Sequence, residues 1–175
     1  MNSISSIEQL IQSFQEAEPA ERGFVLENIA IPRSEFSDLA SWADGCYTRN
    51  CLARCDDFEF ILICWDGHCK TKIHDHSGQD CWVYQVEGTL HEIRFKGPEH
   101  RLDAYHEEQL NPGDLGYMHD KMGYHLIENR NKQRAMSLHI YANPIDECKV
   151  FDEESSRFEI TPLVYDEVHD VVTVG

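Results

Sequence analysis

Three histidines are the residues of this sequence with the clearest capacity for chemistry. His74 and His76 stand two positions apart in Ile-His-Asp-His, and His125 follows in Gly-Tyr-His-Leu. In an extended strand, side chains two positions apart point to one face, with Cβ atoms about 6–7 Å apart. Two imidazoles at that separation can bind one metal ion, and His125 would join them from a neighbouring strand. We therefore predict a three-histidine metal site, rather than solvated histidines at the end of a polar strand.

The ligand set restricts the substrate more than it restricts the metal. Imidazole binds iron, zinc, copper and nickel alike, so the ligand type does not identify the ion. Three neutral ligands leave a divalent ion with its full charge and, in an octahedral site, with three open positions. Such a centre favours an anionic, chelating substrate.

A second row of polar side chains follows in Ser137-Leu138-His139-Ile140-Tyr141. Period-two alternation separates Leu138 and Ile140 from the other three residues. The polar face can form hydrogen bonds in series, from the serine to the imidazole to the phenol. Because unpaired buried polar groups cost free energy, this face is expected to line a polar cavity or to be exposed to water.

Composition excludes several classes of partner. The 175 residues include 15 basic and 32 acidic ones, for a formal net charge of −17, and 41% are hydrophobic. Phosphate backbones and anionic lipid would repel such a surface, so nucleic-acid and membrane-surface binding are not expected. No apolar run approaches the roughly 18–20 residues of a membrane span, and no signal-peptide pattern opens the chain. A cytoplasmic protein is expected.

The cysteines do not suggest a disulfide framework. There are seven, an odd number, in a chain that has the character of an intracellular protein. A zinc site built from Cys51, Cys55, Cys64 and Cys69 is conceivable, but their spacings lack the tight Cys-x2-Cys pairs of zinc knuckles. Most of these thiols are expected to be small buried apolar groups.

The N-terminal part predicts short helices. Ser5 and Glu8 form a capping-box pattern, which predicts a helix with Ser5 at its N-cap. Apolar residues then recur at helical spacing: Ile7, Leu10, Ile11 and Phe14. A second helix is expected over 20–29 and a third from Ser34. These helices are expected to cover another layer and to carry no chemistry.

From Cys46 onward the sequence predicts strands. Runs rich in β-branched or aromatic residues alternate with Gly, Pro, Asn and Asp turns. The expected strands are Phe58–Trp65, Cys81–Val86, Thr89–Phe95, Leu115–Met118, Ala135–Tyr141 and Arg157–Val164. We expect a mainly β chain of one domain over 1–175, with a helical part over 1–45 and an antiparallel sandwich or jelly-roll barrel over 46–175.

The motifs resemble those of the cupin superfamily. His74-x-His76 with Gly88 resembles the first cupin motif, and Gly113 with His125 resembles the second; Cys81 stands where many cupins carry a glutamate ligand. More segments resemble the thiol dioxygenases of this superfamily, above all the cysteine dioxygenase family. They are Tyr47-Thr48-Arg49-Asn50, Ile63-Cys64-Trp65, Tyr117, His125-x-x-Glu128-Asn129, Ser137-Leu138-His139-x-Tyr141 and Cys148 near Phe151-Asp152.

The resemblance implies a cupin jelly-roll β-barrel under a small helical cover, and a set of roles. His74, His76 and His125 would bind Fe(2+), and the protein would oxidise the thiol of L-cysteine with O2 to cysteine sulfinic acid. The implied substrate residues are Arg49 for the carboxylate, Tyr47 beside it, and Trp65 and Cys148 around the pocket. The implied catalytic residues are Tyr141, positioned by His139 and Ser137, and Cys81, whose sulfur would form a thioether with the Tyr141 ring. A monomer is the default expectation.

Two alternatives and one departure accompany this interpretation. A 3-mercaptopropionate dioxygenase would typically carry glutamine at the position of Arg49. A non-enzymatic cupin that binds metal or a small ligand has little need of the polar row that ends at Tyr141. Where close relatives have a proline pair with a cis peptide, this chain has Ala142-Asn143-Pro144. Cis peptides before residues other than proline are costly, so we expect Ala142–Asn143 to be trans.

Overall fold

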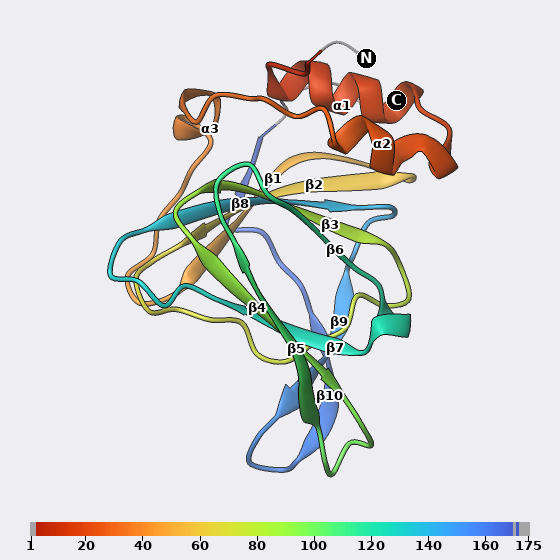
Figure 1. Ribbon diagram of the computed structural model, residues 1–175, viewed down its shortest axis with the longest axis vertical. Coiled ribbons are helices and arrows are strands. Elements are labelled where there is room, and N and C mark those ends of the chain that lie inside the picture. Colours follow the sequence, from red (N-terminus) through yellow and green to blue (C-terminus); the bar gives the residue numbers. More distant parts are fainter. Residues whose placement is uncertain (1–2, 170, 172–175) are drawn as a thin grey trace.

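The computed structural model describes residues 3–169 and 171, and within them a helical layer lies against a set of antiparallel strands (Figure 1). The helical elements are α1 (Ile7–Glu16), η1 (Pro19–Glu21), α2 (Arg22–Leu26), α3 (Ser34–Ser37) and η2 (Asp120–Met122). The first six strands are β1 (Tyr47–Cys55), β2 (Phe58–Trp65), β3 (Cys81–Glu87), β4 (Leu90–Lys96), β5 (Asp103–Leu110) and β6 (Leu115–Met118). The remaining strands are β7 (Tyr124–Glu128), β8 (Ala135–Tyr141), β9 (Glu147–Asp152), β10 (Arg157–Pro162) and β11 (Glu167–Val168).

Two main sheets form the jelly-roll layers. One has six strands in the order β11-β1-β2-β8-β3-β6, and the other has three in the order β5-β4-β7. All of their pairings are antiparallel except that of β1 with β11. A buried apolar cluster joins side chains of both sheets, among them Ile61, Val83, Leu90 and Ile127. The β9–β10 hairpin extends from this body at the end remote from the helices (Figure 1).

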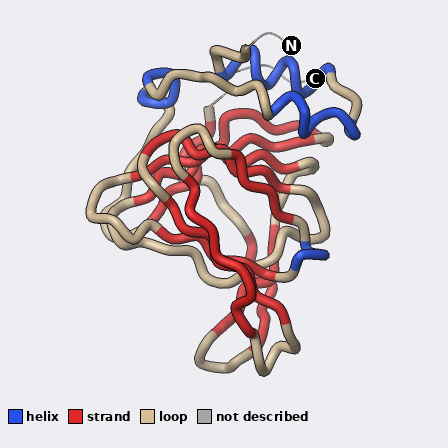
Figure 2. Tube along the Cα trace, viewed as in Figure 1, coloured by secondary structure: helices blue, strands red, loops and turns tan. Residues whose placement is uncertain are grey.

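Period-two alternation gives the six-stranded sheet two apolar faces. On β8, Leu138 and Ile140 belong to the cluster that the helices cover, whereas Ala135 and Tyr141 belong to the cluster between the sheets. The helices lie on one side of the strands, apart from the short η2 (Figure 2). Because helices and sheet share one apolar cluster, we propose that the chain is a single domain. Residues 1, 2, 170 and 172–175 of its expected range lie outside the described residues.

Helix α1 begins one residue later than the capping pattern predicts. The N-cap is Ser6, whose hydroxyl accepts a hydrogen bond from the Gln9 backbone N–H at 3.2 Å. The Gln9 side chain in turn accepts from the backbone N–H of Ser5 at 3.0 Å. The prediction of Ser5 as N-cap was wrong because Ser6 and Gln9 offer an equivalent capping box one position on. The four predicted apolar positions of α1 are all buried.

The other expected helices are shorter than predicted. The range 20–29 contains only part of η1 and the five residues of α2, and α3 spans four residues with Arg33 rather than Ser34 at its N-cap. Neither α2 nor α3 has a side-chain cap, and packing of a few apolar residues such as Leu26 and Phe36 holds them against the sheet. Among the described residues, no helix is both long and apolar enough to cross a membrane.

Candidate metal centre

The segment that carries His74 and His76 is an extended loop rather than the expected strand. His74 forms an isolated antiparallel bridge with His125 of β7 and a second one with Val150 of β9. The His74 N–H donates to the His125 carbonyl at 2.9 Å, and the His125 N–H donates to the His74 carbonyl at 3.0 Å. The loop is thus attached to β7 at the predicted ligands themselves, so residues far apart in sequence become backbone neighbours.

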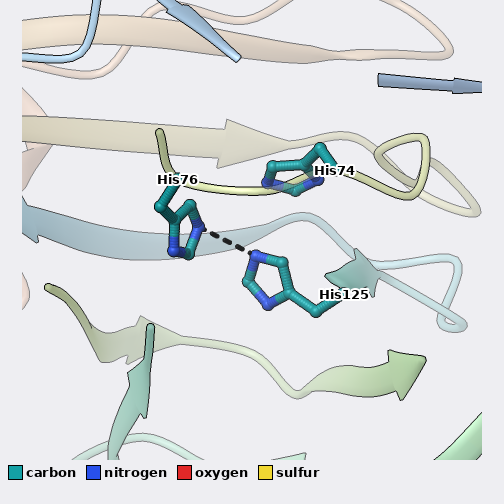
Figure 3. A group of neighbouring side chains, drawn as sticks. All are labelled: His74, His76 and His125. Carbon is teal, nitrogen blue, oxygen red and sulfur yellow. Dashed lines mark hydrogen bonds between the residues drawn. The ribbon is translucent and has the colours of Figure 1, made fainter. Parts of the chain in front are cut away.

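The three imidazoles converge on one point (Figure 3). Each offers a ring nitrogen, and these ligand atoms all lie within 4.8 Å of one another. The Nε2 atoms of His76 and His125 are 3.0 Å apart. An ion with metal–nitrogen bonds of about 2.0–2.1 Å can bind both nitrogens at that separation. Among the described residues this is the only such group of histidine, cysteine and acidic side chains, so the cysteine-based zinc site has no support.

Burial keeps the three rings in the protonation state that binds metal. The pKa values of His76 and His125 lie well below the usual histidine range, mainly because burial disfavours the charged form. Neighbouring imidazoles lower them further. Burial also lowers the pKa of His74, against a hydrogen bond to the Lys72 carbonyl that raises it. Neutral imidazoles are therefore the forms present near neutral pH, as metal ligation requires.

Glu92 orients one of these ligands, and the sequence interpretation did not find it. Its carboxylate accepts a hydrogen bond from His125 Nδ1 at 2.6 Å, which leaves His125 Nε2 as the free lone pair. Arg94 donates to the same carboxylate through Nε and Nη2, at 2.9 and 2.6 Å, and Arg94 also pairs with Glu108. The signal was available: Glu92 and Arg94 share the inward face of a predicted strand with buried Leu90.

Two aspartates hold the histidine loop. Asp120 accepts from the backbone N–H groups of His76, at 2.7 Å, and Gly78. Asp75, which is buried between the two ligands, accepts from the backbone N–H of Lys149 at 2.8 Å. Because these contacts fix backbone rather than side chain, they set the place at which His76 enters the cluster. Sequence spacing alone contains no signal for Asp120.

A cavity of about 380 Å³ opens beside the cluster. Its lining includes six of the predicted site residues, namely Tyr47, Arg49, His74, His139, Tyr141 and Cys148. Among the described residues, the lining has three basic members, Arg49, Lys70 and Lys72, and no aspartate or glutamate. In a chain of net charge −17, such a lining is selective for an anion.

Arg49 has the features of a ligand-binding cation. It lies on β1, and its Nε and Nη2 atoms are buried without a hydrogen-bond partner. A buried polar group without a partner costs free energy, and a guanidinium costs more than a neutral group. The arrangement is therefore suited to a carboxylate entering from the cavity, which can accept two parallel hydrogen bonds from the fork.

The polar row of β8 forms in part as predicted. Trp65 Nε1 donates to Ser137 Oγ at 2.9 Å, and Ser137 Oγ is 3.0 Å from His139 Nε2. His139 and Tyr141 stack with ring centroids 6.5 Å apart, and the expected hydrogen bond between them does not form. Instead, Tyr141 lies opposite Cys81 in the pairing of β8 with β3, and burial is the main cause that raises the pKa of the Cys81 thiol. Trp65 lies behind the cavity lining and supports Ser137, rather than contacting the cavity itself.

Comparison with known proteins agrees with this geometry. A solved protein from Klebsiella pneumoniae described as having a double-stranded β-helix domain superposes with a TM-score of 0.50 at 13% identity, over 61% of this chain and 84% of its own. The fold is thus the double-stranded β-helix, or cupin, fold. The family model for cysteine dioxygenase type I matches residues 3–154.

Curated relatives point to the same family. Human cysteine dioxygenase type 1 is 29% identical over 139 residues, and the rat protein of that name is 30% identical over the same length. In both cases the match covers 76% of this chain and 69% of the relative. The chain belongs to the cysteine dioxygenase type I family of enzymes.

Proposed function

We propose that the protein is an iron(II)-dependent cysteine dioxygenase, which adds both atoms of O2 to the thiol sulfur of L-cysteine and yields cysteine sulfinic acid. The observation that carries the proposal is that Arg49, in the same cavity lining as His74 and Tyr141, has buried Nε and Nη2 atoms without a hydrogen-bond partner. A guanidinium fork fits a carboxylate, and a three-imidazole site beside it fits a thiolate and an amine. The family to which the chain belongs supports the same reaction.

His74, His76 and His125 would hold the iron. Imidazole does not distinguish iron from zinc or copper, so the choice of iron rests on the family. When bound, the ion would supply open positions for a thiolate and O2 and would lower the pKa of the substrate thiol. Glu92 would keep His125 in the tautomer whose Nε2 faces the ion.

The protein residues would act mainly by positioning. Arg49 would hold the carboxylate and so set the distance at which the thiol and amine meet the histidine cluster, with Tyr47 beside it. Holding the reactants in one geometry would lower the barrier, because their encounter then no longer has to occur by chance in solution. The Tyr141 hydroxyl, in the cavity lining, would donate a hydrogen bond to a polar atom of the bound reactants.

The rest of the row would keep Tyr141 in place. His139 stacks on Tyr141, and Ser137 ties His139 to Trp65. Cys148 in the lining would shape the entrance. Lys70 and Lys72 would raise the local concentration of anions, an effect that depends on salt.

Oxygen consumption tests the proposal directly. Iron(II)-loaded protein is mixed with L-cysteine, with 3-mercaptopropionate, or with cysteamine, which lacks a carboxylate, and the products are weighed by mass spectrometry. We expect uptake with L-cysteine and a product heavier by two oxygen atoms. Faster turnover of 3-mercaptopropionate would assign the other thiol dioxygenase activity. No uptake with any thiol in metal-replete protein would favour a non-enzymatic cupin.

A cytoplasmic location and a monomeric state complete the proposal. The composition of the sequence motivates the first, and the second is the default for a chain that needs no partner residue in the cluster described above. Fractionation of the native cell and light scattering of the purified full chain measure these two properties.

A further inference from the structure

The segment after β10 returns to the strand that carries Arg49. The Asp166 N–H donates to the Arg49 carbonyl at 2.8 Å, and the Asp166 carboxylate accepts from the Arg49 backbone N–H, also at 2.8 Å. At the next residue, Glu167, β11 begins to pair in parallel with β1. Asp166, which lies 117 positions later in the chain, therefore holds the backbone of Arg49 through two hydrogen bonds.

Tyr165 brings an aromatic ring to the same arginine. The Arg49 guanidinium carbon lies 6.0 Å from the Tyr165 ring centroid, within the range of a cation–π interaction. The phenol oxygen of Tyr165 accepts a hydrogen bond from Arg54 Nη1 at 2.6 Å. Arg54 is itself neutralised by Asp146 and by buried Glu59. The ring is thus held from behind by an ion-pair network, and its face remains available to Arg49.

We propose that Tyr165 is a positioning residue that orients Arg49 for the substrate carboxylate without neutralising it. The inference rests on the proposed function of Arg49. A protein carboxylate beside Arg49 would hold the guanidinium equally well, but it would occupy the donors that the substrate needs. A ring face attracts the cation and takes no hydrogen bond from Nε or Nη2, which are the two atoms left without partners. Among the described residues Arg49 makes no ion pair, in agreement with this arrangement.

The role predicts dependence on the substrate carboxylate. Loss of the ring leaves the Arg49 guanidinium less ordered, so any ligand that contacts the guanidinium binds more weakly. The contribution of a partly desolvated cation–π pair, about 0.5–2 kcal/mol, corresponds to about 2–30-fold in affinity. A thiol without a carboxylate makes no contact with the fork and is unaffected. The metal cluster is held by other residues and keeps its ion.

The test compares Tyr165→Leu, which keeps apolar packing, with Tyr165→Phe, which keeps the ring and loses the bond to Arg54. Binding of L-cysteine and of cysteamine to anaerobic, iron(II)-loaded full chain is measured by calorimetry, and KM and kcat are measured in air. We expect the leucine variant to bind L-cysteine about 2–30-fold more weakly, with cysteamine and kcat within twofold, and the phenylalanine variant to stay near the parent. Tyr105→Leu is the control. Lys96 Nζ lies 4.5 Å from the centroid of the Tyr105 ring, so this pair is also a cation–π contact, and Tyr105 is not among the described residues that line the cavity.

Three outcomes would overturn the proposal. They are an unchanged affinity for L-cysteine in the leucine variant, an equal loss for cysteamine, and a loss in the phenylalanine variant as large as that in the leucine variant. If the leucine variant does not fold, Tyr165→Met takes its place in the same comparison. A parent protein that binds L-cysteine with the expected dependence but consumes no oxygen would refute the dioxygenase function and leave the role of Tyr165 standing. A parent that does not bind L-cysteine would overturn both.

Discussion

Cys81 and Tyr141 lie directly opposite each other, as cross-strand partners on β3 and β8. Directly opposite residues in an antiparallel pair have Cβ atoms about 4.5–5.5 Å apart, so sulfur and ring are within reach of each other. Both side chains are buried, and the Tyr141 ring centroid is 5.6 Å from that of His76. An oxidation carried out at the histidine cluster would therefore take place next to this pair.

A thioether between Cys81 and Tyr141 is the first prediction. Joining sulfur to the ring removes two hydrogen atoms, so intact mass should fall by about 2 Da after exposure to iron, L-cysteine and O2. Cys81→Ser should never show the lighter species. Cys148→Ser should still form it, because Cys148 lies in the cavity but is not paired with the tyrosine. Parent protein that keeps its full mass after turnover would contradict the prediction.

Replacement of Arg49 should weaken the binding of the substrate and leave the iron content unchanged. Hydrogen bonds to charged groups contribute about 1.5–3 kcal/mol, so Arg49→Ala should raise KM for L-cysteine by about 10–150-fold. Arg49→Lys keeps the charge without the fork and should fall in between. Iron content, measured by atomic absorption, should equal that of the parent. Unchanged steady-state kinetics would remove Arg49 from the substrate site.

His125→Ala should abolish metal binding. Two remaining imidazoles hold a divalent ion far more weakly than three, so protein purified from iron-supplemented medium should contain little iron. His106→Ala, at an exposed position on β5, is the matched control and should retain the parent's content. A His125→Ala variant with full metal occupancy would show that the third ligand is another residue.

Glu92→Gln should lower metal affinity while leaving the ligands in place. Loss of a partner that orients a ligand typically costs 10–100-fold in metal affinity, and competition with a chromophoric chelator measures it. Glu108→Gln is the control, because Glu108 pairs with Arg94 but does not reach His125. Equal affinities in the two variants would mean that the carboxylate of Glu92 serves Arg94 alone.

Gly88→Ala tests the fold itself. Gly88 and Gly45 have the same backbone φ of 71°, a conformation that strains any residue with a Cβ. A Cβ at Gly88 would lie 2.8 Å from the Ala135 Cβ, whereas one at Gly45 meets nothing within 4 Å. Denaturant unfolding should therefore show Gly88→Ala less stable than Gly45→Ala by about 1–3 kcal/mol. Equal stabilities would mean that β8 yields to the added methyl group.

The strands that were predicted best from the sequence are those whose side chains are buried in the apolar clusters. Phe58–Trp65, Leu115–Met118 and Ala135–Tyr141 have the predicted bounds, because apolar runs or alternation matched burial on two faces. Strand β5, Asp103–Leu110, was missed because its side chains are mostly exposed and polar. It exists through backbone pairing with β4, which leaves no trace in the hydrophobic pattern.

The site shows the same limit. The three histidines were found from type and spacing, and the described structure brings them together. Glu92, Asp120 and Tyr165 were not found, because their contributions depend on which strands and loops become neighbours. Strand register and loop closure determine which segments become neighbours, and local composition predicts neither of them.

The two faces of β8 give the N-terminal helices an indirect part in the chemistry. If β8 slipped by one residue against its neighbours, Leu138 and Ile140 would enter the cavity and His139 would turn toward the helices. The apolar surface of α1 opposes that slip, since it would then have to cover imidazole and phenol. Helices that place no side chain in the cavity thereby decide which face of a strand becomes the reactive one.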